Sequence, residues 1–350
     1  MKKWLMIVGA LTILLTGCGD SRQVSEQMAN PSEGVSEGAE AKQTGKTTEE
    51  TPVDSEEDRA YEVSEEKLAV TYQGEAFTTL TMGIGGDWIY ISGRDAENGD
   101  AFLGRIEKGQ SELEKITLEG MENMRAFRIS VEQSGTCHVL WMGMKEKEEN
   151  GQIISQLDLS QSYITTINTD GSLKQKIDIA GVVKEKSLIP YHFVADKEGN
   201  FYFDNGRTII KVGGNGNDFT VIECDGTVEC IGVGLSGQVY CTFYANETTY
   251  LGKIEADRVV ICEVNMPQLV AKFAVMTAGV NTELLLYNRE GGAYGFDGST
   301  QIQECVANKM LPASGEKVLG CGFLNDGRLC LVAQKEGLVF YYEPAEQVQK

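Results

Sequence analysis

From about residue 67 onward, apolar residues occur in short runs that are rich in aromatic and β-branched side chains. Gly, Asn and Asp separate these runs, as is typical of strands joined by tight turns. No long stretch shows the 3.6-residue periodicity of an amphipathic helix. The pattern therefore predicts an all-β domain.

One strand recurs after a turn, and we use it as an anchor for counting repeats. Its six copies are Asp87–Ile91, Gly135–Trp141, Gly199–Phe203, Gly237–Cys241, Thr282–Tyr287 and Gly327–Leu331. Another apolar strand precedes each copy and one or two more follow, at a mean spacing of about 47 residues, which is the period of propeller blades. The pattern predicts a six-bladed β-propeller, with a seven-bladed ring of about 41 residues per blade as the alternative.

The two ends of the domain are expected to close the ring. The last repeat supplies only three strands, near 318–323, 329–333 and 338–342, whereas Leu68–Tyr72 is a strand without an obvious partner. Pairing them removes open sheet edges. We therefore expect a clasp between Leu68–Tyr72 and the last strand.

The second repeat is longer than the others. We interpret Lys145–Asn150 as a charged loop, and Ile153–Leu159 and Tyr163–Asn168 as two additional strands. Such an insertion is a common place for function. A long hairpin without a partner is the alternative.

One repeat carries a resemblance to a known family. Asp196–Lys211 is similar to the blade consensus of NHL-type and related six-bladed propellers, whereas the other repeats share only the hydrophobic rhythm. The resemblance implies the fold and leaves the function open.

The N-terminus predicts export and a lipid anchor. Lys2 and Lys3 precede an apolar segment, Trp4–Leu15, which is too short to span a bilayer and has the form of a signal peptide. Leu15, Thr16, Gly17 and Cys18 then resemble the lipobox of bacterial lipoproteins. The resemblance implies cleavage after residue 17, lipidation of Cys18, and attachment to the extracytoplasmic face of the cell membrane. A plain signal peptide with a chance cysteine is the alternative.

Charge distinguishes the next segment. The chain has a net charge of −21, and residues 19–66 contain 14 acidic and 4 basic side chains with few large apolar ones. Such a segment cannot bury enough surface to fold, so we interpret residues 18–66 as the lipidated cysteine and a disordered linker. The propeller then covers 67–344 and a tail covers 345–350. An acidic chain also argues against nucleic acid as a partner.

Motifs that suggest chemistry have structural explanations. Gly232–Gly237 matches a dinucleotide fingerprint, but a strand follows it instead of a helix, which favours a hairpin turn. A single calcium-type nonapeptide, Gly213–Val221, and an acidic loop, Asp95–Asp100, lack the repeat or spacing that calcium sites need. His138 and His192 are expected in the core or at the rim. We assign no catalytic, metal-binding or cofactor-binding residue, and we expect no cofactor.

Eight further cysteines occur without a C-x-x-C pair, which argues against a zinc or thioredoxin-like motif. They are Cys137, Cys224, Cys230, Cys241, Cys262, Cys305, Cys321 and Cys330. Their apolar strand contexts favour free, buried thiols, although exported proteins often form disulfides. A bridge between Cys321 and Cys330 depends on where the intervening turn is centred.

We therefore expect a monomeric, membrane-anchored protein whose propeller is a non-catalytic binding or sensing module for a glycan, a peptide or another envelope protein. A ring of carboxylates and tyrosines at the centre would instead favour a glycan hydrolase or lyase. A broad apolar surface would favour an assembly scaffold or an accessory domain of a solute-uptake system.

Overall fold

The computed structural model describes residues 64–66, 70–75, 77–95, 97, 99–149, 152–186, 188–264, 273–279, 282–288, 293–304, 317–325, 329–334 and 338–343. The predicted signal peptide, the lipobox with Cys18, the linker up to residue 63 and the tail lie outside these residues.

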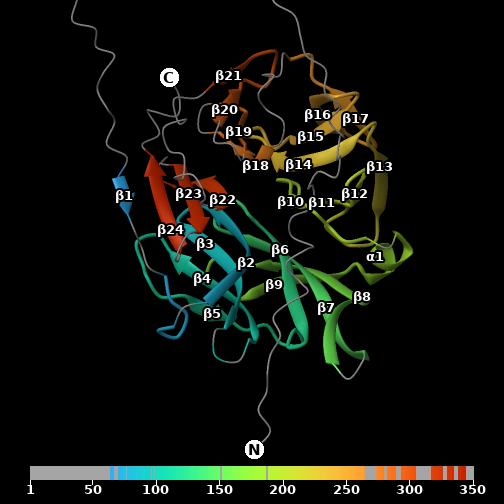
Figure 1. Ribbon diagram of the computed structural model, residues 1–350. Helices are drawn as coiled ribbons and strands as arrows, with labels where there is room; N and C mark the ends of the chain where they lie inside the picture. The colour runs from blue at the N-terminus through green and yellow to red at the C-terminus, as the bar shows by residue number, and fades with distance from the viewer. Residues whose placement is uncertain are drawn as a thin grey trace, which may run out of the picture. The chain divides into compact units, whose positions relative to one another are not determined.

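The described residues form six four-stranded antiparallel sheets and one short helix (Figure 1). Sheets 1 to 3 are β2 (Phe77–Gly85), β3 (Trp88–Asp95), β4 (Ala101–Glu107) and β5 (Glu114–Ile116); β6 (Met124–Val131), β7 (Cys137–Glu149), β8 (Gln152–Ile167) and β9 (Leu173–Asp178); and β10 (Phe193–Ala195), β11 (Phe201–Asp204), β12 (Thr208–Val212) and β13 (Phe219–Glu223). The helix α1 (Ala180–Lys186) lies between β9 and β10 in sequence and contacts β8.

Sheets 4 to 6 have the same up-and-down order. They are β14 (Thr227–Val233), β15 (Val239–Ala245), β16 (Thr248–Glu255) and β17 (Arg258–Ile261); β18 (Phe273–Ala278), β19 (Leu284–Asn288), β20 (Ala293–Phe296) and β21 (Ile302–Glu304); and β22 (Lys317–Phe323), β23 (Leu329–Gln334), β24 (Leu338–Glu343) and β1 (Ser64–Glu66).

The first strands of the sheets contact one another in sequence. β2 contacts β6, β6 contacts β10, and the series continues through β14, β18 and β22, which contacts β2 again. Each of these strands is hydrogen-bonded within its own sheet on one side only, so its other edge faces the centre. This arrangement is a β-propeller, and the all-β propeller prediction is confirmed.

A five-residue turn joins the first and second strands in several sheets, and it explains the recurring anchor. Its fourth residue is Gly135, Gly199 or Gly237, with φ of 84°, 79° and 86°. In all three turns the glycine N–H bonds to the carbonyl of the first turn residue at 2.9–3.0 Å. Glycine adopts this left-handed conformation without steric cost. At these three anchors the glycine in the sequence pattern is therefore required by the turn.

Apolar layers between adjacent sheets form the core. Tyr90 and Leu103 of sheet 1 pack in one cluster with Met124, Val139 and Ile167 of sheet 2. Similar clusters lie between sheets 2 and 3, 3 and 4, 4 and 5, and 6 and 1. The core is thus divided among the sheet interfaces.

The N-terminal clasp exists, but its residues were predicted wrongly. β1 pairs with β24, with Ser64 opposite Tyr342 and Glu66 opposite Phe340. Thr71, from the segment expected to form the clasp, instead makes an isolated bridge with Glu112, which lies between β4 and β5. The sequence of β1, Ser-Glu-Glu, contains no apolar residue that would predict a strand. Its pairing with β24 depends on backbone hydrogen bonds instead of apolar side chains.

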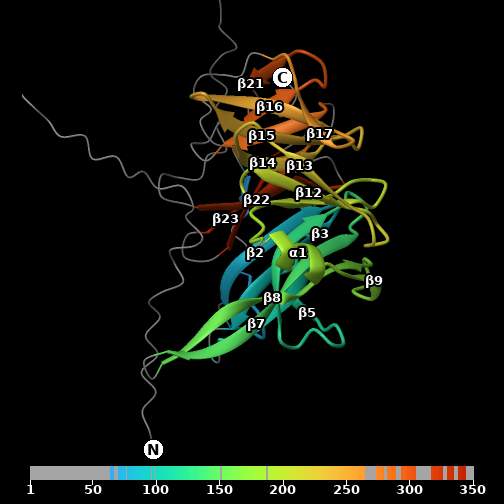
Figure 2. The same ribbon diagram turned by 90° about the vertical axis from the view of Figure 1, so that its right-hand side faces the viewer.

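The prediction for the second repeat was also wrong in detail. Lys145–Glu149 is not a loop: it continues β7 and pairs with residues 152–156 of β8. The two expected strands are one strand, β8, with a register shift opposite Met142 and Gly143. The alternating charged tip of this hairpin extends beyond its neighbours, as Figure 2 shows.

Among the described residues, no helix has the length and apolar character required to cross a membrane.

Glycines allow the first strands to approach one another closely at the centre. A Cβ atom added to Gly85 would lie 2.3 Å from the Glu132 carbonyl oxygen, and one added to Gly232 would lie 2.7 Å from the Met276 carbonyl oxygen. Both obstacles are backbone atoms: Met276 is in β18, and Glu132 directly follows β6. No rotamer change can therefore relieve the clash.

We predict that Gly85→Ala lowers the free energy of unfolding by about 1–3 kcal/mol, because strand β2 must move away from β6. Chemical denaturation would measure this change. Gly181→Ala is the matched control: nothing lies within 4 Å of the added methyl, and alanine favours helix α1. Equal stability of the Gly85→Ala variant and the unmodified protein would contradict the close packing described here.

Candidate functional site

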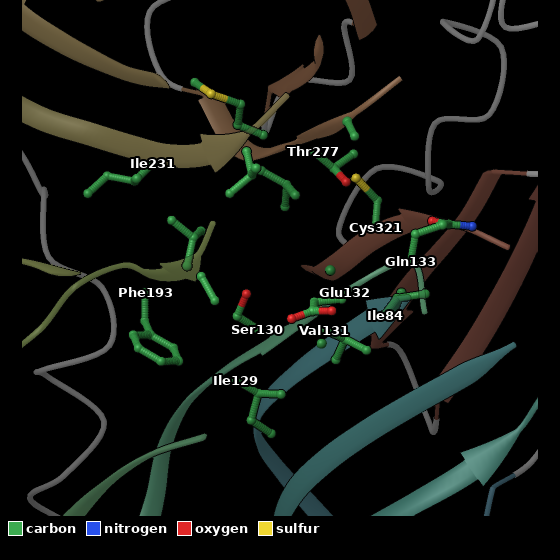
Figure 3. Close-up of a pocket in the computed structure, with 18 of the residues that line it drawn as sticks. Ile84, Ile129, Ser130, Val131, Glu132, Gln133, Phe193, Ile231, Thr277 and Cys321 are labelled. Carbon is green, nitrogen blue, oxygen red and sulfur yellow. The ribbon is translucent and has the colours of Figure 1, made fainter. Parts of the chain in front are cut away.

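A cavity of about 690 Å³ lies at the centre of the six first strands. Figure 3 shows Ile84, Ile129, Phe193, Ile231 and Cys321 around it. Its walls are largely apolar, and its volume is in the range of pockets that bind small molecules or short segments. Because the unpaired edges of the first strands face it, the cavity also offers backbone N–H and C=O groups.

The cavity has two chemically different ends. We call the end where the first strands begin the entry end, and the end where they turn into the second strands the turn end. Each carries a large, exposed, partly apolar side chain among its lining residues: Tyr191, 48% exposed, at the entry end and Leu235, 56% exposed, at the turn end. A ligand would therefore meet apolar surface at either opening.

Carboxylates at the turn end form hydrogen bonds that stabilise the turns. Glu132 Oε1 is 2.7 Å from His138 Nε2, and its Oε2 accepts a hydrogen bond from Ser134. Asp196 accepts hydrogen bonds from the Asn200 backbone N–H at 2.8 Å and the Tyr202 hydroxyl at 3.0 Å. These contacts hold each turn against the second strand of its sheet. The two carboxylates therefore have a structural role.

A basic group occupies the entry end. Arg128 lines the cavity, and its Nε donates a hydrogen bond to the Tyr191 carbonyl at 2.7 Å. Its guanidinium also lies 4.4 Å from the centre of the Phe127 ring. Burial lowers the pKa of Arg128 to about 10, although the negative charge of Asp204 opposes this shift. Arg128 remains a cation at neutral pH.

A histidine and a buried aspartate lie beside Arg128. Asp204 is fully buried, and its Oδ1 is 2.9 Å from both the backbone N and the Nδ1 of His192. Its Oδ2 accepts a hydrogen bond from the Gly206 N–H. This pairing orients the imidazole and leaves its Nε2 without a hydrogen-bond partner among the described residues.

The two histidines lie in the predicted places. His138 is buried between β7 and β8, where Nδ1 contacts the Thr166 hydroxyl at 3.1 Å, and His192 is at the rim of the cavity. Sequence reasoning did not identify Asp204 or Arg128. Asp204 lies within Asp196–Lys211, where the sequence predicts only the blade pattern, and the register of the β10–β11 hairpin is the signal that could have placed it opposite His192.

The glycine-rich motifs are turns, as expected. Residues 234–238 join β14 to β15, and residues 213–218 join β12 to β13. No cluster of three His, Cys, Asp or Glu side chains suited to a metal occurs within the described ranges. Predicted site residues Leu15, Thr16, Gly17 and Cys18 lie outside those ranges.

The cysteine prediction is confirmed where the structure describes it. Free thiols are present at Cys137, Cys224, Cys230, Cys241, Cys262 and Cys321, of which Cys224 and Cys262 are only partly buried. Leu331 lies opposite Cys321 and Gly322 lies opposite Cys330, so the two cysteines point to opposite faces of sheet 6. A bridge between them is therefore excluded.

No protein-family model matches the sequence, and no curated protein matches it. Solved structures match in fold. YCF48 from Cyanidioschyzon merolae has a TM-score of 0.46 at 11% identity, with 75% of this chain and 81% of that chain covered. The gluconolactonase XC5397 from Xanthomonas campestris has a TM-score of 0.49 at 10% identity, covering 79% and 89%. The PQQ-bound aldose sugar dehydrogenase from Streptomyces coelicolor has a TM-score of 0.47 at 10% identity, covering 79% and 96%. The likeness concerns the fold alone.

The contact between Glu132 and His138 makes a pH-dependent contribution to stability. The hydrogen bond with His138 lowers the pKa of Glu132. A lowered pKa in the folded state means that ionised Glu132 stabilises the fold above its unfolded pKa of about 4.3. This contribution is lost as the pH falls through the lower folded-state value.

We predict that Glu132→Gln reduces the free energy of unfolding by about 1 kcal/mol at pH 6, because a charge-assisted hydrogen bond is lost. The difference from the unmodified protein should shrink below about pH 4, where the carboxylate protonates. Thermal unfolding across this pH range measures it, with Glu119→Gln at an exposed position as the control. A pH-independent difference would exclude ionisation of Glu132 as its cause.

Proposed function

We propose that the protein is a lipid-anchored extracytoplasmic binding protein whose ligand enters the central cavity of a six-bladed propeller. The observation that carries this proposal is the apolar cavity bounded by the edges of six first strands. Cys18 would hold the chain to the membrane, and the acidic linker would separate the propeller from the surface.

Our inference of six blades is based on the sheets. Each of the six described sheets supplies one first strand to the cavity, and β22 contacts β2. We infer that each sheet is one blade and that the pairing of β1 with β24 closes the ring. The seven-bladed alternative would need a further sheet between two first strands that already contact each other.

Among the expected ligands, we favour a peptide segment with apolar side chains. Open strand edges can exchange backbone hydrogen bonds with an extended peptide, and apolar walls can accept its side chains. Glycan recognition would be supported by unengaged carboxylates along the wall in addition to the exposed ring of Tyr191. Glu132 and Asp196, which line the cavity, already bind turn atoms.

One observation favours a second candidate, a lyase that acts on an acidic glycan. Asp204 orients His192 beside the cation of Arg128, an arrangement suited to removing a proton next to a carboxylate. The two functions differ in the role of His192: in binding it only lines the opening, whereas in the lyase it carries the proton.

Similar folds do not select between these candidates. The matched structures include YCF48 bound to D1 peptide as well as a gluconolactonase and a sugar dehydrogenase. The choice therefore depends on the cavity itself.

We predict that Cys18→Ala abolishes incorporation of labelled palmitate when the full chain is produced in a bacterial host, because the acylated thiol is removed. Cys262→Ala, which alters a half-buried cysteine of the propeller, should leave labelling unchanged. Fluorography of the purified protein measures both. Labelled palmitate on the Cys18→Ala variant would contradict the proposed anchor.

We predict that the full chain selects apolar peptides from a random phage-displayed library, and that Thr277→Trp weakens the best peptide at least about tenfold by filling the cavity. Thr277 lines the cavity, whereas Thr248→Trp places the same ring on an exposed strand and should change nothing. Calorimetric titration measures the affinities. Failure to enrich any peptide, or equal affinity in both variants, would contradict peptide binding in the cavity.

A further inference from the structure

Two cysteine thiols from different sheets meet between sheets 3 and 4. Cys241 lies in β15 and is fully buried, whereas Cys224 directly follows β13 and is only partly buried. Both side chains belong to the apolar cluster between the two sheets. A hydrogen bond joins the Cys241 thiol to the Cys224 sulfur. Two free thiols are therefore held in contact across a sheet interface.

Backbone contacts bring the two cysteines together. The Cys224 N–H donates a hydrogen bond to the Arg207 carbonyl at 3.0 Å, which fixes the residue at the end of sheet 3. Two residues later the chain meets β15, since a Cβ atom added to Gly226 would lie 2.3 Å from the Tyr244 carbonyl oxygen. Cys241 lies three positions before Tyr244 on that strand. The approach of the connecting segment to β15 thus does not depend on the sulfur atoms.

Cys230 and Cys262 provide an internal comparison, because they share the next apolar cluster, between sheets 4 and 5. The Cys230 thiol donates a hydrogen bond to the Ile231 carbonyl at 3.8 Å. Sharing an apolar cluster therefore does not by itself join two thiols. Cys224 and Cys241 differ in that one sulfur is the hydrogen-bond partner of the other.

The two thiols differ in reactivity. The hydrogen bond with Cys224 and burial raise the pKa of the Cys241 thiol. The thiolate is the reactive form of cysteine, so a buried thiol with a raised pKa is protected from reagents in solvent. Cys224 is partly exposed, and it is the thiol of the pair that an external oxidant reaches first.

We propose that Cys224 and Cys241 are a reversible disulfide site that links sheet 3 to sheet 4 when the protein meets a small-molecule disulfide. The Cys224 thiolate attacks one sulfur of the oxidant and forms a mixed disulfide, and the other half of the oxidant leaves as a thiolate. Cys241 then loses its proton to water and attacks the Cys224 sulfur, which releases the second half. Two protein thiols are oxidised to one disulfide, and the oxidant is reduced to two thiols. This modification site is independent of the function proposed above.

The test is to expose the full chain to oxidised glutathione at about pH 8, where thiolates are available, and then to alkylate the remaining thiols. Cleavage after Glu223 and Glu229 releases Cys224 in a fragment separate from Cys241. Tandem mass spectrometry of linked fragments then identifies which cysteines are bonded. Cys262→Ser, which alters another partly buried thiol, is the matched control.

We expect a disulfide that joins the two fragments in both the unmodified protein and Cys262→Ser. The oxidised protein should melt at least about 3 °C higher, because the bond restricts the unfolded chain, and dithiothreitol should reverse the shift. A chain that stays reduced, or glutathione that remains bound to Cys224 of the unmodified protein, would overturn the proposal.

Cys241→Ala separates the two steps of the reaction. Without the second thiol, glutathione should remain on Cys224 as a stable mixed disulfide, and the absence of this adduct would show that the oxidant does not reach Cys224. Cys224→Ser keeps the test decisive if Cys241→Ala fails to fold, because it changes only a partly buried side chain. A rise in Tm with oxidised glutathione that persists in Cys224→Ser would assign the effect to other cysteines and overturn the site.

Discussion

The close approach of the first strands at the centre determines most of this structure. β2 and β6 approach so closely that Gly85 has no room for a methyl group, and β14 meets β18 at Gly232 in the same way. Each of these strands pairs on one side only, within its own sheet. Their free edges must face the centre, so an apolar cavity with polar backbone rims follows from the packing.

Charge is then divided between the two ends of the cavity. At the turn end, Glu132 and Asp196 stabilise tight turns by accepting hydrogen bonds from neighbouring residues. At the entry end, Arg125 and Arg128 lie beside the Phe127 ring, and Arg125 has no carboxylate partner among the described residues. The turn end therefore carries carboxylates that are held by turn contacts, and the entry end carries two guanidinium groups beside one aromatic ring.

The sequence predicts the strands well where local chemistry determines them. Turn glycines such as Gly199 require a left-handed backbone, and the apolar strands that follow mark the anchors. It fails where only pairing determines the strand: β1 is Ser-Glu-Glu, and the tip of β7 is charged, yet both are held by neighbouring strands. The contact of Asp204 with His192 depends on the register in which β11 pairs with β10, and the isolation of Arg125 depends on its surroundings in the folded chain; no local motif indicates either.

An irregularity in the first strands explains why polar groups gather at the entry end. Five of these strands contain a register shift near their beginning, between Thr79 and Thr81 in β2 and between Ala126 and Arg128 in β6. Such bulges bend a strand and redirect its side chains. In sheet 3 the regular pairing stops at Phe193, and the Asp204 carboxylate binds the N–H of His192 instead. Because the ladder is interrupted near this end in five of the six strands, side chains there do not follow the simple alternation of the pleat and are oriented by individual contacts.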